Sequence, residues 1–233
     1  MKHSNLTFSI VIPVYNKEAF IAEAIQSILD QTVQDFEIIL IDDASNDSST
    51  DICTFFSREY DHVHYYRNDK NMGIGFSRNR GNRIAKGEWI VVQDADDISY
   101  PDRLEKFVSF LERNPTTDMY YTAIDVADDK LNIYDHWPAK EVTAFALRNG
   151  DQVVPHATCI YKRDLIIETP YLDSQRVNDD YPLIVEWWNK GYVFKPNTTP
   201  TTLYRVLPSG VSSQNFQRIQ KELPIWEKLV QDR

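Results

Sequence analysis

Cysteine, glycine and long apolar runs are all scarce in this sequence. Its 233 residues include only 2 cysteines, too few for a disulfide framework or a zinc site. No apolar stretch reaches the ~20 residues that a membrane span requires, and the first residues lack the apolar run of a signal peptide. The 7 glycines argue against low-complexity linkers. We therefore expect a cytoplasmic protein that folds as a single domain over 1–233.

Basic residues are also few compared with acidic ones. The chain has 25 Lys and Arg against 35 Asp and Glu, for a formal net charge of -10. Nucleic-acid polymers normally bind to a basic face, so no nucleic-acid partner is expected. A smaller anionic ligand remains compatible if a metal cation supplies the missing positive charge.

Strand and helix patterns alternate along the first half of the chain, to about residue 115. The expected strands are 8–15, 36–41, 63–67 and 89–92, and the expected helices between and after them are 21–29, 48–56, 75–86 and 101–113. Such alternation predicts the α/β class, with a central, mostly parallel sheet flanked by helices on both faces.

The pattern loosens beyond residue 115. We expect strands at 119–124, 158–161 and 202–206 and a helix at 180–190. The segment 214–233 reads as an amphipathic helical tail, interrupted by Pro224. Packing on the domain is its default role; dimerisation and peripheral contact with the inner face of a membrane are open alternatives.

A dense group of acids directly follows the expected strand at 89–92. Asp94, Asp96 and Asp97 lie within four residues of one another. The carboxyl ends of parallel strands are where ligands bind in open α/β sheets, and oxygen clusters suit Mg²⁺ or Mn²⁺. A metal site for a phosphate-bearing ligand is one interpretation; capping of the helix that follows, near Pro101 and Asp102, is the other.

Four ordered blocks within about one hundred residues resemble a known family. They are Ser9–Asn16 with Ile28–Thr32, Ile41–Asp47, Asn71–Gly73 with Arg78, Asn79 and Gly81, and Asp94–Asp97. Together they strongly resemble the family 2 glycosyltransferases, which are inverting enzymes of the GT-A fold with nucleotide-sugar donors. The resemblance is clear over 8–115, which would be the nucleotide-sugar-binding half, and thinner over 116–213, the acceptor-side half.

The resemblance implies donor-binding roles for residues in the first three blocks. Tyr15, in the same block as the donor-binding Pro13, would stack on the base, although an aromatic ring that covers the core is its ordinary alternative. Asp43 would accept a hydrogen bond from the uracil N3–H, which cytosine lacks. Arg78 would lie beside the base and phosphates; a helix-surface salt bridge is the alternative.

In the fourth block, the resemblance places Asp94 on the ribose and Asp96 on the metal, Mn²⁺ or Mg²⁺. Asp97 would hold a ligating water or cap the next helix. With the family pattern added, the metal interpretation is preferred over capping. Many relatives place a histidine near the metal where this chain has Leu207, which leaves the third metal contact open.

An inverting transfer also needs a base for the acceptor hydroxyl. Asp180 matches the family's base and Asp179 the acid before it, while helix capping is the alternative for an Asp at this position. His156 resembles an acceptor-side position that faces the sugar; a satisfied histidine at a strand end explains it nearly as well.

The expected function is transfer of a hexosyl or N-acetylhexosaminyl group, by metal-assisted single displacement, from a UDP-sugar to a hydroxyl of a glycan, glycolipid or lipid-linked acceptor in polysaccharide biosynthesis. A sugar-1-phosphate nucleotidyltransferase is an alternative, but its glycine-rich loop has no counterpart in 14–18. An inactive binding module is another. A dinucleotide-binding dehydrogenase fits least, because 73–78 lacks the third glycine. Donor sugar, acceptor, linkage and oligomeric state are left open.

Overall fold

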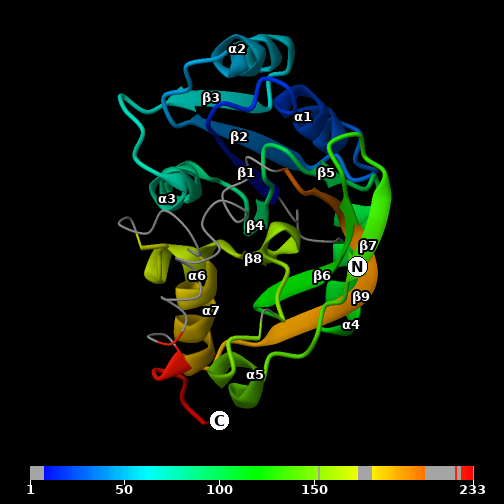
Figure 1. Ribbon diagram of the computed structural model, residues 1–233, viewed down its shortest axis with the longest axis vertical. Coiled ribbons are helices and arrows are strands. Elements are labelled where there is room, and N and C mark those ends of the chain that lie inside the picture. Colours follow the sequence, from blue (N-terminus) through cyan, green and yellow to red (C-terminus); the bar gives the residue numbers. More distant parts are fainter. Residues whose placement is uncertain (1–7, 152, 173–179, 208–223, 225–226, 233) are drawn as a thin grey trace.

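A computed structural model describes residues 8–151, 153–172, 180–207, 224 and 227–232 (Figure 1). The strands are β1 (Phe8–Val14), β2 (Phe36–Asp42), β3 (Val63–Arg67), β4 (Trp89–Val92), β5 (Ile98–Ser99), β6 (Met119–Ala127), β7 (Ile133–Trp137), β8 (Ile160–Lys162) and β9 (Phe194–Arg205). The helices are α1 (Ile21–Leu29), α2 (Ser49–Glu59), α3 (Ile74–Ile84), α4 (Arg103–Arg113), α5 (Ala144–Arg148), α6 (Arg163–Glu168) and α7 (Asp180–Asn189), with a 3₁₀ turn, η1 (His156–Thr158).

One sheet of mixed direction joins these strands, in the order β3-β2-β1-β4-β8-β6-β9-β5, with β7 on β6. The first part, β3-β2-β1-β4, is parallel throughout. Beyond β4 the sheet becomes mixed, because β8 runs antiparallel to both β4 and β6, while β6 and β9 are parallel. The predicted α/β class is confirmed, and the parallel pairing that the sequence suggested for most of the sheet is concentrated in its first half.

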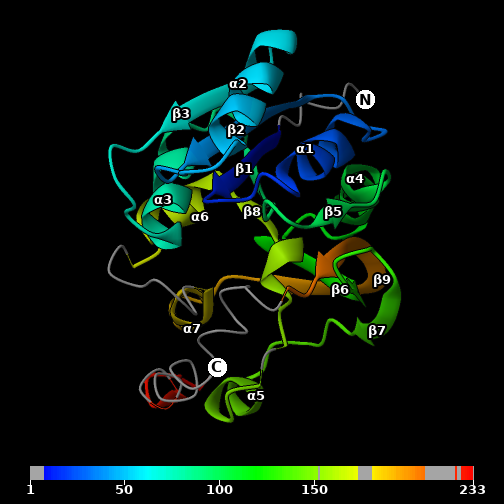
Figure 2. The ribbon, with the colours of Figure 1, turned by 45° about the horizontal axis from the view of Figure 1, so that its top comes forward.

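Two apolar clusters lie on the two faces of the sheet. Successive side chains of a strand point to opposite faces, so Ile10 and Ile12 join the cluster of α1, α2 and α4, whereas Val11 joins the cluster of α7. The views in Figures 1 and 2 agree that α2 and α3 lie on opposite sides of β2 and β3. Burial on both faces explains why β1, β2 and β4 read as continuous apolar runs rather than as alternating ones.

Helix α3 approaches β1 unusually closely, and a glycine makes this possible. A Cβ atom at Gly81 would lie 2.4 Å from Val11 Cγ1, a distance that a stiff β-branched neighbour cannot relieve by rotating away. The close approach holds the N-terminus of α3 beside the carboxyl ends of β1 and β2. The position of the candidate site thus depends on this contact.

Several elements were not expected from the sequence. In the first half this is β5, and in the second half these are β7, α5, α6 and the first eight residues of β9. All residues of β7 are exposed, so the strand has no apolar alternation to detect, and α5 and α6 are only 5 and 6 residues long. No helix in the described ranges is long and apolar enough to cross a membrane.

The described part of the tail packs on the domain, as its default interpretation predicts. Trp188 Nε1 in α7 donates to the Gln231 carbonyl at 2.9 Å, and Arg148 Nη1 lies 2.7 Å from Asp232 Oδ1. Val230 is buried in the same cluster as α7. The rest of the expected tail, including residues 214–223, lies outside the described residues.

Candidate active site

Asp43 lies between the end of β2 and the N-terminus of α3. Its buried carboxylate accepts hydrogen bonds from the backbone N–H of Met72 and Gly73, each at 2.8 Å, and from Asn68 Nδ2 at 2.7 Å. Gly73 has φ 98°, a left-handed conformation that glycine adopts without steric cost. A carboxylate offers about four acceptor positions, so this one can still accept a further bond from a ligand.

Asp42, the preceding acid, has a structural role. Its fully buried carboxylate accepts hydrogen bonds from Ser45 N, Thr50 Oγ1, Tyr65 Oη and Arg67 Nη1 at 2.7–2.8 Å. Burial alone would raise the pKa of Asp42, but the hydrogen bonds from Ser45, Thr50 and Tyr65 outweigh it, and its pKa lies below the usual value. The carboxylate organises the loop after β2.

The loops that follow β1 and β2 are tied to each other. Asn16 N donates to Ser45 Oγ at 3.1 Å, and Asn46 N donates to Asn16 Oδ1 at 2.8 Å. Asn16 and Ala44 both have positive φ, at 52° and 62°. Non-glycine residues in this conformation cluster at functional sites.

Tyr15 projects from the loop after β1, and 43% of its surface is exposed. A ring exposed to this extent is accessible to a ligand, and its buried part is compatible with the alternative that it covers the core. Pro13 is half-buried inside β1, opposite Ile41 of β2. Of these two donor-binding candidates, only Tyr15 presents a largely exposed ring.

The acids after β4 are held by cations from other segments. Arg78 Nη2 in α3 lies 2.7 Å from Asp94 Oδ1, and Lys17 Nζ after β1 lies 2.5 Å from Asp96 Oδ2. Arg78 therefore does form a salt bridge, as its alternative interpretation expects, but its side chain is only 6% exposed, so the pair is buried rather than on the helix surface. The acid loop, residues 94–97, is thus linked to both of the segments that carry the other donor-binding candidates.

Asp97 is the most deeply buried acid of the loop. Its Oδ1 accepts the Arg205 backbone N–H at 2.9 Å, and its Oδ2 is buried with no hydrogen-bond partner among the residues that the structure describes. Burial, followed by the charges of Asp96 and Asp94, raises its pKa well above the usual value. Since β5 separates it from α4, whose N-cap is Asp102, Asp97 does not cap that helix.

We tested whether the acid loop fits a divalent cation. Its oxygen donors, its excess of negative charge and the partnerless Asp97 Oδ2 all suit a hard cation. Within the described ranges, no three His, Cys, Asp or Glu side chains converge as a complete metal cage. A Mg²⁺ or Mn²⁺ ion on Asp96 would thus need further oxygens from a diphosphate and water, which is usual for Mg²⁺ at phosphate sites.

Arg103 is buried beside the strand end that carries the acid loop, and it was not singled out from the sequence. Its buried guanidinium donates to the carbonyls of Val92 and Ala157 at 2.8 and 3.1 Å and to Ser99 Oγ at 2.9 Å. Burial lowers its pKa to about 10. Nothing in a single sequence separates such an arginine from the charged residues on the solvent side of the same helix.

His156 is connected to the acid loop through Tyr171 and Arg78. Its Nε2 lies 2.9 Å from Tyr171 Oη, and the Arg78 guanidinium lies 5.6 Å from the centre of the Tyr171 ring. Burial, followed by the charge of Arg78, lowers the pKa of His156 well below its usual value. The imidazole is therefore neutral at physiological pH and has a hydrogen-bond partner.

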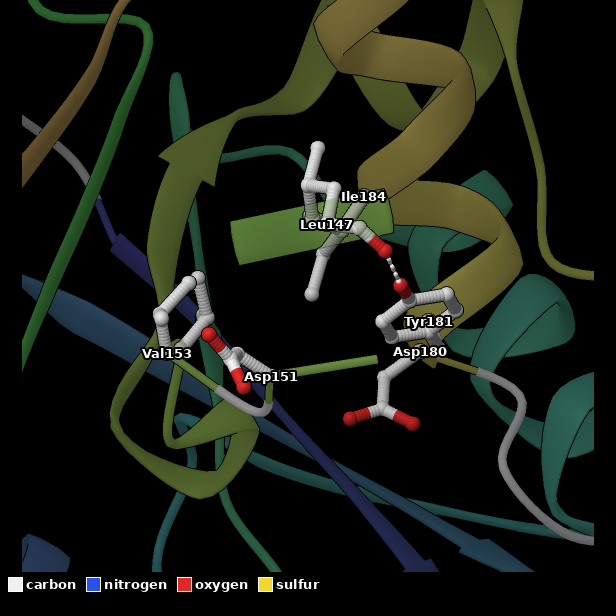
Figure 3. A pocket seen from close by; sticks show the side chains of 7 residues that line it. Leu147, Asp151, Val153, Asp180, Tyr181 and Ile184 are labelled. Carbon is white, nitrogen blue, oxygen red and sulfur yellow. Dashed lines mark hydrogen bonds between the residues drawn. The ribbon is translucent and has the colours of Figure 1, made fainter. Parts of the chain in front are cut away.

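Asp180 lies in the first turn of α7 and lines a small, partly open pocket (Figure 3). The carboxylates of Asp151 and Asp180 share this pocket with the apolar side chains Leu147, Val153, Val154 and Ile184 and with Tyr181. None of Asp43, Asp94 and Asp96 lines it. Asp179, expected beside Asp180, lies outside the described residues.

Cys159 is a fully buried core residue. Burial is the main cause that raises its pKa well above the usual value, so the thiol is neutral.

Two tryptophans of the second half differ in their access to a sugar. Trp187 is 1% exposed and packs edge-on against Tyr161, so it cannot stack on a sugar, whereas Trp137 is 45% exposed. Leu207 is buried and offers no ligand in place of the histidine of many relatives.

Comparison with known proteins identifies the family. The sequence model of glycosyl transferase family 2 matches residues 9–169. The chain belongs to this family. One relative, an uncharacterized glycosyltransferase (MJ1057) of Methanocaldococcus jannaschii, is 28% identical over 193 residues, which are 80% of this chain and 66% of the relative.

Solved structures show the same fold. TarS of S. aureus (residues 1–349), crystallised with UDP, has a TM-score of 0.73 at 19% identity, over 94% of this chain and 65% of that one. The mannosyltransferase PcManGT of Pyrobaculum calidifontis, in complex with GDP-Man and Mn²⁺, has a TM-score of 0.68 at 17% identity, over 94% and 62%. The GT-A fold expected from the sequence is confirmed. The chain spans less than two thirds of the length of the curated relatives that it matches first.

Proposed function

We propose that this family 2 glycosyltransferase transfers a sugar from a UDP-sugar to an acceptor hydroxyl, with inversion and with the assistance of a divalent metal ion. The observation that carries the proposal is the set of links among the strand ends. Asp43 accepts the backbone N–H of Gly73 at the N-terminus of α3, and Arg78 of the same helix binds Asp94 of the acid loop. Donor-binding candidates from distant segments are thereby held around one helix.

In the proposed donor complex, Tyr15 stacks on the uracil and Asp43 accepts its N3–H, while Asp94 bonds to the ribose. The exposed ring of Tyr15 and the acceptor capacity left on Asp43 support these roles. PcManGT is solved with a guanine nucleotide, so a GDP-sugar is the donor to compare directly.

Asp96 would hold Mn²⁺ or Mg²⁺ together with the oxygens of the diphosphate, and Asp97 would hold a ligating water. The bound ion stabilises the negative charge that develops on the leaving nucleoside diphosphate. The Arg78 guanidinium, directed at the same loop, adds a fixed positive charge beside it.

Asp180 is the proposed base. As the acceptor oxygen attacks the anomeric carbon, its proton passes to the Asp180 carboxylate. The bond between that carbon and the donor phosphate oxygen breaks, and its electron pair leaves with UDP, which inverts the configuration. The surface around Asp180, which combines apolar side chains with the carboxylate of Asp151, is the proposed acceptor side for a glycan, glycolipid or lipid-linked acceptor. His156, Trp137 and Asp179 are further candidates on this side.

Ligand-induced stabilisation tests the donor part of the proposal. A ligand that binds only the native state at 100 times its Kd adds about 2.7 kcal/mol to the free energy of unfolding. We expect UDP with Mn²⁺ to raise the Tm, and Asp96→Asn to abolish the increase. A panel of UDP-sugars and GDP-mannose would identify the donor. Stabilisation by GDP-mannose but not by any UDP-sugar would refute the uracil assignment.

Single-turnover transfer tests the base. Asp180→Asn should keep the stabilisation by UDP and Mn²⁺ and lose transfer by about two to four orders of magnitude, the usual contribution of a general base. Equal transfer by wild type and Asp180→Asn would refute the role of Asp180 as base, and no transfer by either protein would support the inactive-module alternative. Release of pyrophosphate from UTP and a sugar phosphate would support the nucleotidyltransferase alternative, which the family match disfavours.

A further inference from the structure

The side chain of Lys17 occupies the position where the proposed metal ligand would meet its cation. Its Nζ lies 2.5 Å from Asp96 Oδ2, across 79 positions of the chain, and the two side chains are 23% and 18% exposed. An ion pair so largely shielded from water is screened less than a surface pair. The family resemblance assigned no role to this lysine.

The backbone of Lys17 is held firmly on both sides. Its N–H donates to Ser49 Oγ at 2.8 Å, and its carbonyl accepts the N–H groups of Phe20 and Ile21 at 2.9 Å. The ammonium group lies at the end of a flexible four-carbon side chain, which is attached to this fixed backbone. The ammonium group can therefore exchange partners without any movement of the loop.

The charges of the acid loop are incompletely matched. Arg78 neutralises Asp94 and Lys17 neutralises Asp96, while the third carboxylate, Asp97, has one oxygen without a hydrogen-bond partner in the described part of the chain. A divalent cation that binds Asp96 must displace the ammonium group from the same oxygen. The displaced lysine then lies beside whatever anion the metal carries.

We propose that Lys17 is an exchangeable counter-ion: it neutralises Asp96 before the donor arrives and moves to the donor diphosphate when the metal takes its place. This inference rests on the proposed function, in which Asp96 binds the metal. Lysine is a common ligand of phosphate, as a compact point charge. The exchange gives Asp96 a positive partner in both states and delays metal binding until a diphosphate is present to receive the lysine.

The exchange predicts effects of opposite sign on two ligands. Without Lys17, free Mn²⁺ no longer competes with an ammonium group, so Mn²⁺ alone should bind more tightly. UDP at saturating Mn²⁺ should bind more weakly, because the diphosphate has lost a positive charge. A lysine that merely stabilised the fold would weaken both ligands or neither.

The test compares Mn²⁺ binding, followed by electron paramagnetic resonance in the absence of nucleotide, with UDP binding by calorimetry at saturating Mn²⁺. For Lys17→Gln we expect Mn²⁺ affinity to rise about three- to tenfold and UDP affinity to fall by a similar factor, the range of a partly shielded ion pair. Lys17→Arg keeps the competing charge and should stay near wild type for Mn²⁺ alone. The matched control is Lys106→Gln, which removes a lysine paired with Asp102 on α4 and should change neither affinity.

Asp96→Asn separates failure of this inference from failure of the proposed function. If Asp96→Asn abolishes Mn²⁺-dependent UDP binding while Lys17→Gln changes both affinities in the same direction or leaves both unchanged, the counter-ion role is refuted and the metal role of Asp96 stands. If Asp96→Asn binds UDP and Mn²⁺ as wild type does, both proposals fall. Opposite shifts in Lys17→Gln, with Lys106→Gln unchanged, support the exchange.

Discussion

Arg78 Nη2 in α3 lies 2.7 Å from Asp94 Oδ1 in the loop after β4. The guanidinium also lies over the ring of Tyr171, whose backbone is hydrogen-bonded on both sides to Asn79 of the same helix. Arg78 thus joins α3, the acid loop and the segment before residue 173. A change in the geometry of Arg78 should therefore lower the affinity for the donor.

We expect Arg78→Lys to weaken UDP binding at saturating Mn²⁺ by about tenfold, because lysine keeps the charge but loses the planar fork that orients a carboxylate. The free energy of unfolding should fall by about 1–2 kcal/mol, since a buried charged hydrogen bond becomes poorly made. Calorimetry and urea unfolding measure the two effects. Arg83→Lys, on the exposed side of the same helix, is the control; equal losses in both variants would contradict the assignment.

Asp42→Asn should destabilise the protein by about 1–3 kcal/mol at neutral pH, because a buried acceptor of several hydrogen bonds loses its charge. The pKa of Asp42 is lowered in the folded state, so its stabilising contribution is present above the unfolded pKa of about 3.9 and is lost as the pH falls below that value. Urea unfolding between pH 7 and pH 3 should show a smaller decrease for the variant than for wild type. If the free energy of unfolding decreases equally with falling pH in both proteins, Asp42 does not contribute to the loss of stability in acid.

Ala44→Gly should stabilise the protein by about 0.5–1 kcal/mol. Ala44 has φ 62°, where an L side chain costs about 1–2 kcal/mol, and glycine removes that cost while losing somewhat more chain entropy on folding. The same substitution at Ala24, inside α1, should instead destabilise by about 1 kcal/mol. Thermal unfolding of both variants is sufficient, and stabilisation at both positions or at neither would argue against strain at residue 44.

Gly81→Ala should destabilise the protein by about 1–3 kcal/mol despite the better helix propensity of alanine, because the new methyl group would clash with Val11 Cγ1. UDP affinity should fall as well if α3 moves away from β1. A double-mutant cycle with Val11→Ala checks the mechanism. The pair should be less destabilised than the sum of the single variants, and an additive result would place the cost elsewhere.

Much of the first half could be predicted from sequence, because its elements are long and strongly patterned. Strands β3 and β4 and helix α1 lie at their expected positions, and the acids after β2 and β4 follow strand ends as expected. The second half was predicted less well. Its elements are short or exposed, as in β7 and α5, and β9 extends well before the expected strand because its outer part carries little apolar signal.

The sequence by itself determined the α/β alternation, the four blocks that indicate the family and the carboxylates that candidate chemistry requires, since these depend on local pattern and residue type. Only the tertiary structure decided which charged side chains form ion pairs with each other. The Arg78–Asp94 and Lys17–Asp96 pairs and the buried guanidinium of Arg103 join segments far apart in the chain. Such pairings arise because α3 packs closely on the sheet and because strands distant in the chain, such as β1 and β4, are neighbours in the sheet. Neither arrangement can be read from the local order of residues.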